Sequence, residues 1–344
     1  MSNEQLTVGI IGEGKMGTNL FYYLLDFGFS MVWVCSKDAD TDKIIRSFNR
    51  KIKRSLDVGI IDEITWSNLQ ANTKITTDLQ QLKHCDLIIE AITEEADLKQ
   101  KLFIELEAIT SDNCILASNS SSVNPSDLSA TLSRKNRVIG LHFFYPVALR
   151  NIVEIIISQD TSEEVIEKVK HFLSLINRDH LLLKENCSFI LNKIFLDFQN
   201  EAFLIVSEED MTFSQMDTLI RKYFFPAGVF DFCDSVGNDI MLTSVRNYTS
   251  DYPGKAHYMK FITELERLVK NNNYGVKSGA GFYTYPVEGN DDELLNDLNI
   301  ERIIERLEFT LTSTIDRLSS QSGISGDILN HAMKEYLGSE KNFL

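Results

Sequence analysis

The chain has 344 residues, of which 43% are hydrophobic and 24% charged, and its formal net charge is −16. This length allows two domains with a sizeable core, and the composition is that of a folded globular protein rather than a disordered or fibrous one. The negative charge argues against nucleic-acid binding, because neutralising phosphates requires a basic face.

The cysteines and the N-terminus predict a cytoplasmic protein. The five cysteines are scattered without C-x-x-C spacing, so we expect free thiols in a reducing compartment and no metal site. Met1 leads into the first apolar run within about five residues, which leaves no room for a signal peptide. No apolar stretch approaches the ~18 residues of a membrane-spanning helix, so no membrane association is expected.

A glycine-rich turn follows the first apolar run. Residues 6–11 pass directly into Gly12-x-Gly14-x-x-Gly17, and a helical pattern comes next. In this arrangement the glycines permit a tight turn, close approach of phosphates to the backbone, and packing of helix on strand, with amide N–H groups aimed at the anion. The turn predicts a dinucleotide site, a merely structural loop being the alternative. The residues expected at the cofactor here are Gly12, Gly14, Lys15, Met16 and Gly17.

Apolar runs alternate with amphipathic helical patterns through the first half, which is typical of a parallel sheet covered by helices. The expected strands are Val8–Ile11, Met31–Cys35, Leu87–Ala91, Cys114–Ser118, Val138–His142, Ile152–Ile157 and His180–Leu183, and a helix is expected at Leu98–Ile109. From about residue 186 the pattern is helical. The expected helices there are Phe189–Ser207, Gln215–Phe224, Gly237–Tyr248, His257–Asn271, Ile303–Leu318 and Asp327–Tyr336.

These patterns predict an α/β fold in three parts. Residues 1–185 form a Rossmann-like, mainly parallel sheet with helices on both faces, 186–290 an all-α domain, and 291–344 a helical C-terminal extension. The apolar faces of the extension must be buried somewhere, and they could enlarge a dimer interface.

A histidine and a glutamate lie on neighbouring predicted strands. His142 ends one strand, at the edge where open α/β sheets bind ligands, and Glu154 lies on the next, after a turn at Tyr145–Pro146. A carboxylate beside an imidazole fixes its tautomer and stabilises the imidazolium, which makes the pair a general base. The alternative is a structural histidine bound to a local carbonyl.

Seven segments occur in the order and at the spacing of one known family, from about residue 6 to 285. They are Gly12–Gly17, Ile89–Glu94, Ala117–Ser122, Gly140–Phe144, Val153–Glu154, Phe189–Asn192 and Lys277–Tyr283. On these segments the chain resembles the 3-hydroxyacyl-CoA dehydrogenase family. The resemblance implies an NAD-dependent oxidoreductase of fatty acid metabolism, a homodimer formed through the helical domain, and a 3-hydroxyacyl thioester interconverted with its 3-oxoacyl counterpart.

The resemblance also assigns roles to side chains. His142 and Glu154 match the pair that moves the proton of the substrate's 3-hydroxyl. Ser121 and Asn192 match positions that hydrogen-bond the substrate's oxygens, since a carbonyl that gains negative charge needs fixed donors. A polar strand-to-helix turn at Ser121 and a polar core residue at Asn192 are the structural alternatives.

Further positions match cofactor and coenzyme contacts. Glu94 and Lys99 match positions on the nicotinamide ribose side, with Asn119 nearby in the sequence motif, although surface charges would look the same. Ser47, Arg50 and Arg54 lie on a helical stretch that in the family meets coenzyme A. The cations of that stretch are Arg46, Arg50, Lys51, Lys53 and Arg54. They offer a counter-charge for phosphates, and a solvated helix face is the alternative.

One departure concerns the cofactor. An acidic residue normally ends the second strand and binds the adenosine ribose, but Cys35 stands there, 23 positions after Gly12, followed by Ser36 and Lys37. Ser36 and Lys37 could hold a 2′-phosphate, whereas Asp38 and Asp40 oppose one. We expect NAD, with NADP as the alternative.

Other departures lie near the substrate. Tyr145 replaces the usual asparagine after the histidine motif, and changes occur at Cys187-Ser188 and at Val229. They favour a divergent substrate bound partly by Tyr145, carried on coenzyme A or on an acyl carrier protein that would dock on the basic stretch. A dehydrogenase of a small free hydroxy acid and a catalytically silent dinucleotide-binding protein are the alternatives.

Overall fold

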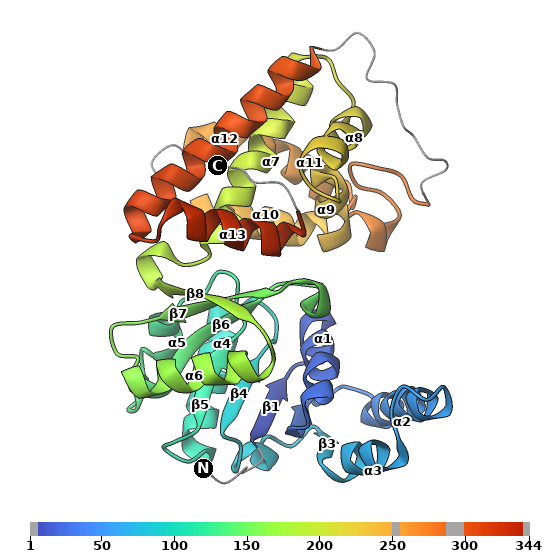
Figure 1. Ribbon diagram of the computed structural model, residues 1–344, viewed down its shortest axis with the longest axis vertical. Coiled ribbons are helices and arrows are strands. Elements are labelled where there is room, and N and C mark those ends of the chain that lie inside the picture. The colour runs from blue at the N-terminus through green and yellow to red at the C-terminus, as the bar shows by residue number, and fades with distance from the viewer. Residues whose placement is uncertain (1–5, 250–254, 287–298, 340–344) are drawn as a thin grey trace. The chain divides into compact units, whose positions relative to one another are not determined.

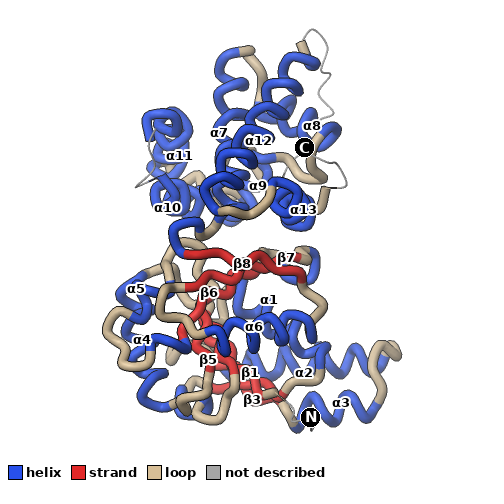
Figure 2. The backbone as a smooth tube through the Cα atoms, turned by 60° about the vertical axis from the view of Figure 1, so that its left-hand side comes forward, coloured by secondary structure: helices blue, strands red, loops and turns tan. Residues whose placement is uncertain are grey.

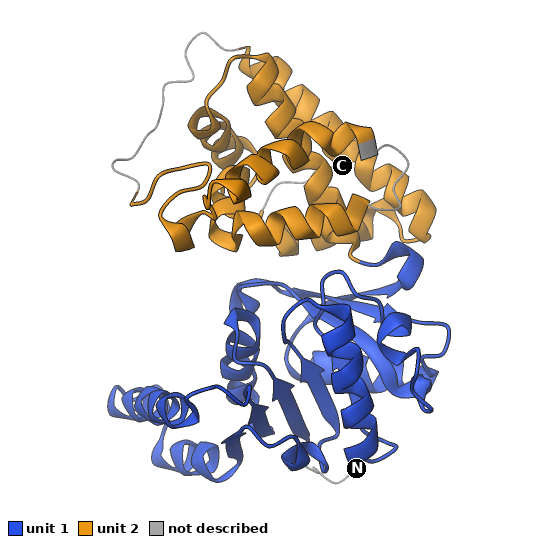
Figure 3. Ribbon diagram, turned by 180° about the vertical axis from the view of Figure 1, so that it is seen from behind, with its two compact units in different colours: residues 1–188 blue, residues 189–344 orange. Residues whose placement is uncertain are grey.

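The computed structural model describes residues 6–249, 255–286 and 299–339. The chain divides into two compact units, Met1–Ser188 and Phe189–Leu344 (Figure 3). The strands of the sheet all lie in the first unit, and the second is helical (Figure 2). None of the described helices is long and apolar enough to cross a membrane.

The first unit is built on an eight-stranded sheet in the order β3-β2-β1-β4-β5-β6-β7-β8 (Figure 1). The strands are β1 (Thr7–Ile11), β2 (Ser30–Val34), β3 (Thr73–Thr76), β4 (Leu87–Glu90), β5 (Ile115–Ser118), β6 (Val138–Phe143), β7 (Ile152–Ile157) and β8 (Asp179–Lys184). Every neighbouring pair is parallel except β6 and β7. The mainly parallel sheet predicted from the sequence is thereby confirmed.

The sequence pattern does not mark strand β3. Its residues, Thr-Lys-Ile-Thr, pair with β2 at the edge of the sheet, and none of them is buried. An edge strand without a buried apolar run lacks the signal that identified the other seven strands.

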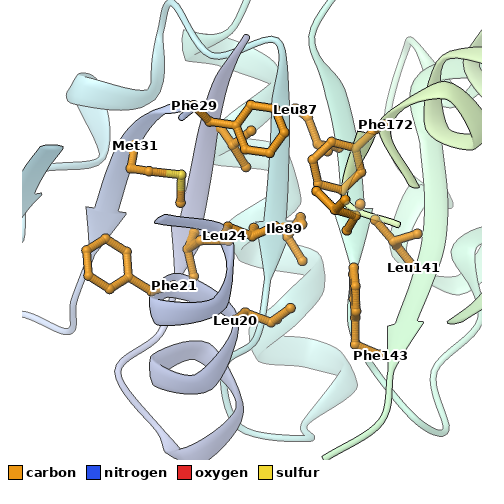
Figure 4. Close-up of a cluster of buried hydrophobic side chains, with 14 of the residues drawn as sticks. Leu20, Phe21, Leu24, Phe29, Met31, Leu87, Ile89, Leu141, Phe143 and Phe172 are labelled. Atoms are coloured by element: carbon orange, nitrogen blue, oxygen red, sulfur yellow. The ribbon is translucent and has the colours of Figure 1, made fainter. Parts of the chain in front are cut away.

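Six α-helices accompany this sheet. They are α1 (Lys15–Leu24), α2 (Thr41–Asp57), α3 (Glu63–Ala71), α4 (Ala96–Ile109), α5 (Pro125–Ser129) and α6 (Glu163–Leu175). Successive residues of β4 point to opposite faces of the sheet. Ile89 joins a core cluster with Phe21 of α1 and Phe172 of α6 (Figure 4), whereas Ile88 joins a second cluster with residues of α4 and α5. Helices therefore cover both faces, as predicted.

The second unit consists of seven described α-helices. They are α7 (Ile190–Glu208), α8 (Phe213–Tyr223), α9 (Val229–Val236), α10 (Asn238–Thr249), α11 (Met259–Lys270), α12 (Ile300–Ser322) and α13 (Gly326–Leu337). Six of them were predicted, with ends that differ by one to four residues, and α9 was not. A short helix of eight residues offers little periodicity to recognise.

The C-terminal extension packs on the chain's own helix α7. The predicted apolar stripe of α12, including Leu307 and Ile315, is fully buried. Arg306 of α12 binds Glu201 and Glu208 of α7. The buried apolar stripe of α12 is therefore covered by a helix of the same chain.

Candidate active site

The glycine turn has the geometry that its sequence predicts. Gly12 has φ +109°, and a Cβ atom on Gly17 would lie 2.2 Å from the Gly12 carbonyl oxygen, so helix α1 and the turn could not pack with a side chain there. Trp33 Nε1 donates to the same carbonyl at 2.9 Å and fixes the turn from β2. Gly14, at the N-cap of α1, faces open space. These residues fit a pyrophosphate held at a helix N-terminus.

His142 and Glu154 are direct partners across the antiparallel strands β6 and β7. His142 Nδ1 lies 2.8 Å from Glu154 Oε2, and both side chains are buried, at 5% and 0% exposure. The ring of Phe144 packs edge-on against the imidazole with a centroid distance of 4.5 Å. A carboxylate oxygen facing Nδ1 favours the neutral tautomer that carries its hydrogen on Nδ1 and in which Nε2 can accept a proton.

Asn119 connects the ends of β5 and β6 beside this pair. Its Oδ1 accepts a hydrogen bond of 2.9 Å from the backbone N–H of Phe143, the residue after His142. The Asn119 side chain is buried, and this hydrogen bond fixes the end of β6 relative to the end of β5.

Lys99 lies in the interior between two carboxylates, not on a solvated helix face. Its Nζ is 2.6 Å from Glu90 Oε1 and 3.2 Å from Glu94 Oε2, and only 1% of the side chain is exposed. Glu90, at the end of β4, also accepts a hydrogen bond from Ser118 Oγ at 2.6 Å. The sequence analysis missed Glu90, although an acid inside a buried strand is itself a signal of a paired charge.

Glu94 accepts several hydrogen bonds from the serine-rich turn that follows β5. Its Oε1 accepts from the backbone N–H groups of Ser121 and Ser122 at 2.9 Å, and from Ser122 Oγ at 2.8 Å. Burial alone would raise the pKa of Glu94, but the charge of Lys99 and the hydrogen bonds from the serines outweigh it and hold that pKa below its usual value. Ser121 Oγ lies 3.4 Å from the same oxygen. The structure therefore brings Glu94, Lys99 and Ser121 together.

Of the residues expected at the adenosine ribose at the end of β2, Cys35 instead lies in the core. Cys35 is 4% exposed, belongs to the core, and has a pKa raised to about 11 by burial. Ser36 is exposed, but its N–H and hydroxyl both donate to the carboxylate of Glu13, in the glycine turn. Lys37 is exposed. The sequence analysis missed Glu13.

The basic residues of α2 separate into two groups. Lys51 lies over the ring of Tyr22 at 3.6 Å, and Lys53 pairs with Asp57. The arginines at four-residue spacing are exposed and, within the part of the chain that is described, form no ion pair: Arg46, Arg50 and Arg54. Ser47, exposed beside them, hydrogen-bonds the Tyr22 side chain. Helix α2 adjoins β3, so the sheet order sets it several strands away from His142.

Tyr145 links the end of β6 to the glycine turn. Tyr145 is 42% exposed, and Lys15 Nζ lies 4.4 Å from the centroid of its ring. Met16, the next residue of α1, packs against the core.

Asn192 belongs to α7 of the second unit. Its Nδ2 donates to the Tyr248 hydroxyl at 2.7 Å, and its Oδ1 accepts from the Tyr336 hydroxyl at 3.1 Å. Neither tyrosine was marked in the sequence. Tyr336 lies on α13, so the C-terminal extension holds a predicted substrate contact.

Comparisons with known proteins identify the family of the chain. Residues 7–186 match the family model described as 3-hydroxyacyl-CoA dehydrogenase, NAD binding domain, and residues 189–285 match its C-terminal domain. The chain is 26% identical over 281 residues to 3-hydroxybutyryl-CoA dehydrogenase of Clostridioides difficile, covering 81% of this chain and 99% of that protein. It is 28% identical to the mitochondrial hydroxyacyl-coenzyme A dehydrogenase of Homo sapiens, covering 81% and 90%.

Solved structures give the same result. The (S)-3-hydroxybutyryl-CoA dehydrogenase of Ralstonia eutropha is 29% identical, with a TM-score of 0.73 over 82% of this chain and 99% of that chain. The dehydrogenase part of multifunctional enzyme 1 from C. elegans is 24% identical, with a TM-score of 0.64 over 96% of this chain and 78% of that one. The second likeness concerns the fold alone, and its coverage includes most of the helices beyond residue 285.

Proposed function

The chain belongs to the 3-hydroxyacyl-CoA dehydrogenase family of NAD-dependent oxidoreductases, and from this premise we propose that His142 and Glu154 interconvert a 3-hydroxyacyl thioester and its 3-oxoacyl counterpart. The observation that carries the proposal is the buried 2.8 Å contact between His142 Nδ1 and Glu154 Oε2 at the end of β6. A paired, oriented imidazole at this edge of the sheet has the chemistry that the reaction requires.

In the oxidation, the proton of the 3-hydroxyl moves to His142 Nε2 while the C3–H bond breaks and C3 becomes a carbonyl carbon. The bound nicotinamide supplies the hydride acceptor, or the donor in the reverse direction. Glu154 stabilises the imidazolium that forms, because the positive charge appears beside a buried carboxylate. In the reduction, His142 returns the proton to the oxygen of C3, so atoms and charges balance in both directions.

Ser121 and Asn192 are the proposed hydrogen-bond donors to the substrate's oxygens. Glu94 fixes the backbone of Ser121 through its N–H group, and two tyrosines fix Asn192. Donors held in this way need no reorganisation as charge develops on the carbonyl oxygen. Asn119 and Lys99 act on the cofactor side as positioning residues, through the strand ends that they hold.

The arginine stripe of α2 is the proposed site for the thioester carrier. Three exposed guanidinium groups on one helix face suit either the phosphates of coenzyme A or the acidic surface of an acyl carrier protein. Ser47 and Tyr145 would line the path of the acyl group. Reversing the charge of Arg50 and Arg54 is expected to raise KM for the thioester. An unchanged KM would instead favour a small free hydroxy acid as substrate.

A direct assay tests the proposed reaction. Purified protein is supplied with acetoacetyl-CoA and NADH, and the loss of NADH absorbance is followed. The proposal expects turnover that His142→Ala lowers by roughly 10²–10⁴-fold, the usual contribution of a general acid–base group. Bound NADH without turnover on coenzyme A or carrier-protein substrates would favour the catalytically silent alternative.

The homodimer and the cytoplasmic location stay predictions. Light scattering on the purified protein, and fractionation of cells that produce it, would test them separately from the activity.

A further inference from the structure

The glycine turn and the end of β2 meet at one carboxylate. Glu13 Oε2 accepts the backbone N–H of Ser36 at 2.9 Å, and Glu13 Oε1 accepts the Ser36 hydroxyl at 2.5 Å. Partial burial alone would raise the pKa of Glu13, but the hydrogen bonds from Ser36 outweigh it and hold that pKa below its usual value. Glu13 is therefore a fixed anion at neutral pH.

This carboxylate lies where a dinucleotide domain needs one. In such domains an acid at the end of the second strand accepts the hydroxyls of the adenosine ribose. Cys35 holds that place in the sequence, but its thiol is buried, neutral and directed into the core. A carboxylate offers about four lone-pair sites, so each oxygen of Glu13 can bind Ser36 and still accept a ribose hydroxyl.

We propose that Glu13 replaces the missing strand-end acid, accepts the adenosine ribose hydroxyls and makes the protein select NAD over NADP. Two effects exclude a 2′-phosphate. Its negative charge would meet the carboxylate, and the two donors of Ser36 that could bind it are already occupied. The acid has moved from the strand end into the turn, between Gly12 and Gly14.

Cofactor binding without substrate tests the proposal, and its readout is independent of the acyl reaction. The wild-type protein is titrated with NADH and with NADPH, and the dissociation constants are taken from nicotinamide fluorescence. We expect tighter binding of NADH, and Glu13→Gln is expected to reduce the NADH preference by roughly tenfold or more, the equivalent of one charge-assisted hydrogen bond. Ser36→Ala should shift the ratio in the same direction by less, because Glu13 then loses one of its two anchors.

Asp38→Asn tests the competing explanation, because the sequence analysis names Asp38, an exposed acid on the same loop, as a residue that opposes a 2′-phosphate. This variant should keep the wild-type ratio, and thermal melting shows which variants are folded. The proposal is overturned if the wild type binds NADPH as tightly as NADH. It is also overturned if folded Glu13→Gln and Ser36→Ala both keep the wild-type preference, or if Asp38→Asn alone removes it.

Discussion

Both units bury carboxylates, and the two most deeply buried ones described in the second unit are neutralised differently from those of the first. In the first unit Glu90 and Glu94 share the ammonium of Lys99, and Glu154 faces an imidazole. In the second unit Asp217 and Asp234 are bound by backbone N–H groups and by uncharged side chains. Their described donors are the N–H groups of Phe230, Asp231, Phe282 and Tyr283, the hydroxyls of Tyr283 and Tyr285, and the amide of Asn238.

The glutamates of the first unit have charged or ionisable partners and lie where chemistry can occur, whereas the two aspartates of the second unit hold a loop in place. Burial raises the pKa of Asp217 to about 6, despite its hydrogen bonds, whereas Lys99 and the serines hold the pKa of Glu94 low. Neutral hydrogen-bond donors only partly replace the solvation that a carboxylate loses on burial. A cation or an imidazolium also compensates the negative charge of the carboxylate. Asp217 and Asp234 tie residues 282–285 to α8 and α9, and the glutamates support the strand ends near His142.

The largest expected effect on stability comes from removing the shared cation. Lys99→Met should lower the free energy of unfolding by about 3–5 kcal/mol, because Glu90 then lies buried without a compensating charge. Urea denaturation followed by circular dichroism measures this change. Lys101→Met, on the exposed part of the same helix, is the control and should change stability by less than about 0.5 kcal/mol. Equal stability of the two variants would show that the buried pair contributes nothing.

The two kinds of carboxylate should respond oppositely to pH. The folded pKa of Asp217, about 6, lies above its unfolded value of about 3.9, so the folded state holds the proton more tightly and this group's contribution falls as pH rises between them. Stability of the wild type relative to Asp217→Asn should therefore fall by roughly 2–3 kcal/mol from pH 4 to pH 7.

Glu94 provides the matching measurement. Its folded pKa lies below the unfolded value, so its contribution is present above the unfolded pKa and is lost as pH falls through the folded one. Relative to Glu94→Gln, the wild type should thus gain stability as pH rises from 3 to 5. If the stability differences of both pairs of proteins changed with pH in the same direction, Asp217 and Glu94 would not be neutralised in different ways.

The smallest expected effect concerns the extension. Tyr336→Phe removes the hydroxyl that binds Asn192 Oδ1, at a cost of about 1 kcal/mol in unfolding free energy. If Asn192 binds substrate, kcat should also fall while the NADH dissociation constant stays unchanged. Tyr223→Phe, on α8, removes a tyrosine hydroxyl for which no contact with Asn192 is described, and it should leave kcat intact. A fall in kcat with both variants would indicate a general loss of structure.

The sequence predicted the features that local residue patterns record, such as strands, but missed contacts between side chains that lie far apart in the chain. Seven of the strands follow from apolar runs in the sequence, and the pairing of His142 with Glu154 follows from two adjacent strands. The edge strand β3 has no buried run. The contact of Glu13 with Ser36 spans 23 residues and that of Tyr336 with Asn192 spans 144, so no local pattern records them. The resemblance placed Lys99 on the cofactor side, with a solvated surface charge as the alternative, and helical periodicity could not show the two carboxylates that enclose it.

The central claim is that His142 and Glu154 act as one proton-transfer unit, and a double-mutant cycle on kcat measures this directly. His142→Ala, Glu154→Gln and the double variant are compared with the wild type in the reduction of acetoacetyl-CoA by NADH. We expect each single variant to lower kcat, and Glu154→Gln to cost little further once His142 is absent, since the carboxylate acts through the imidazole. Full kcat in His142→Ala, or an equal loss from Glu154→Gln with and without His142, would contradict the account.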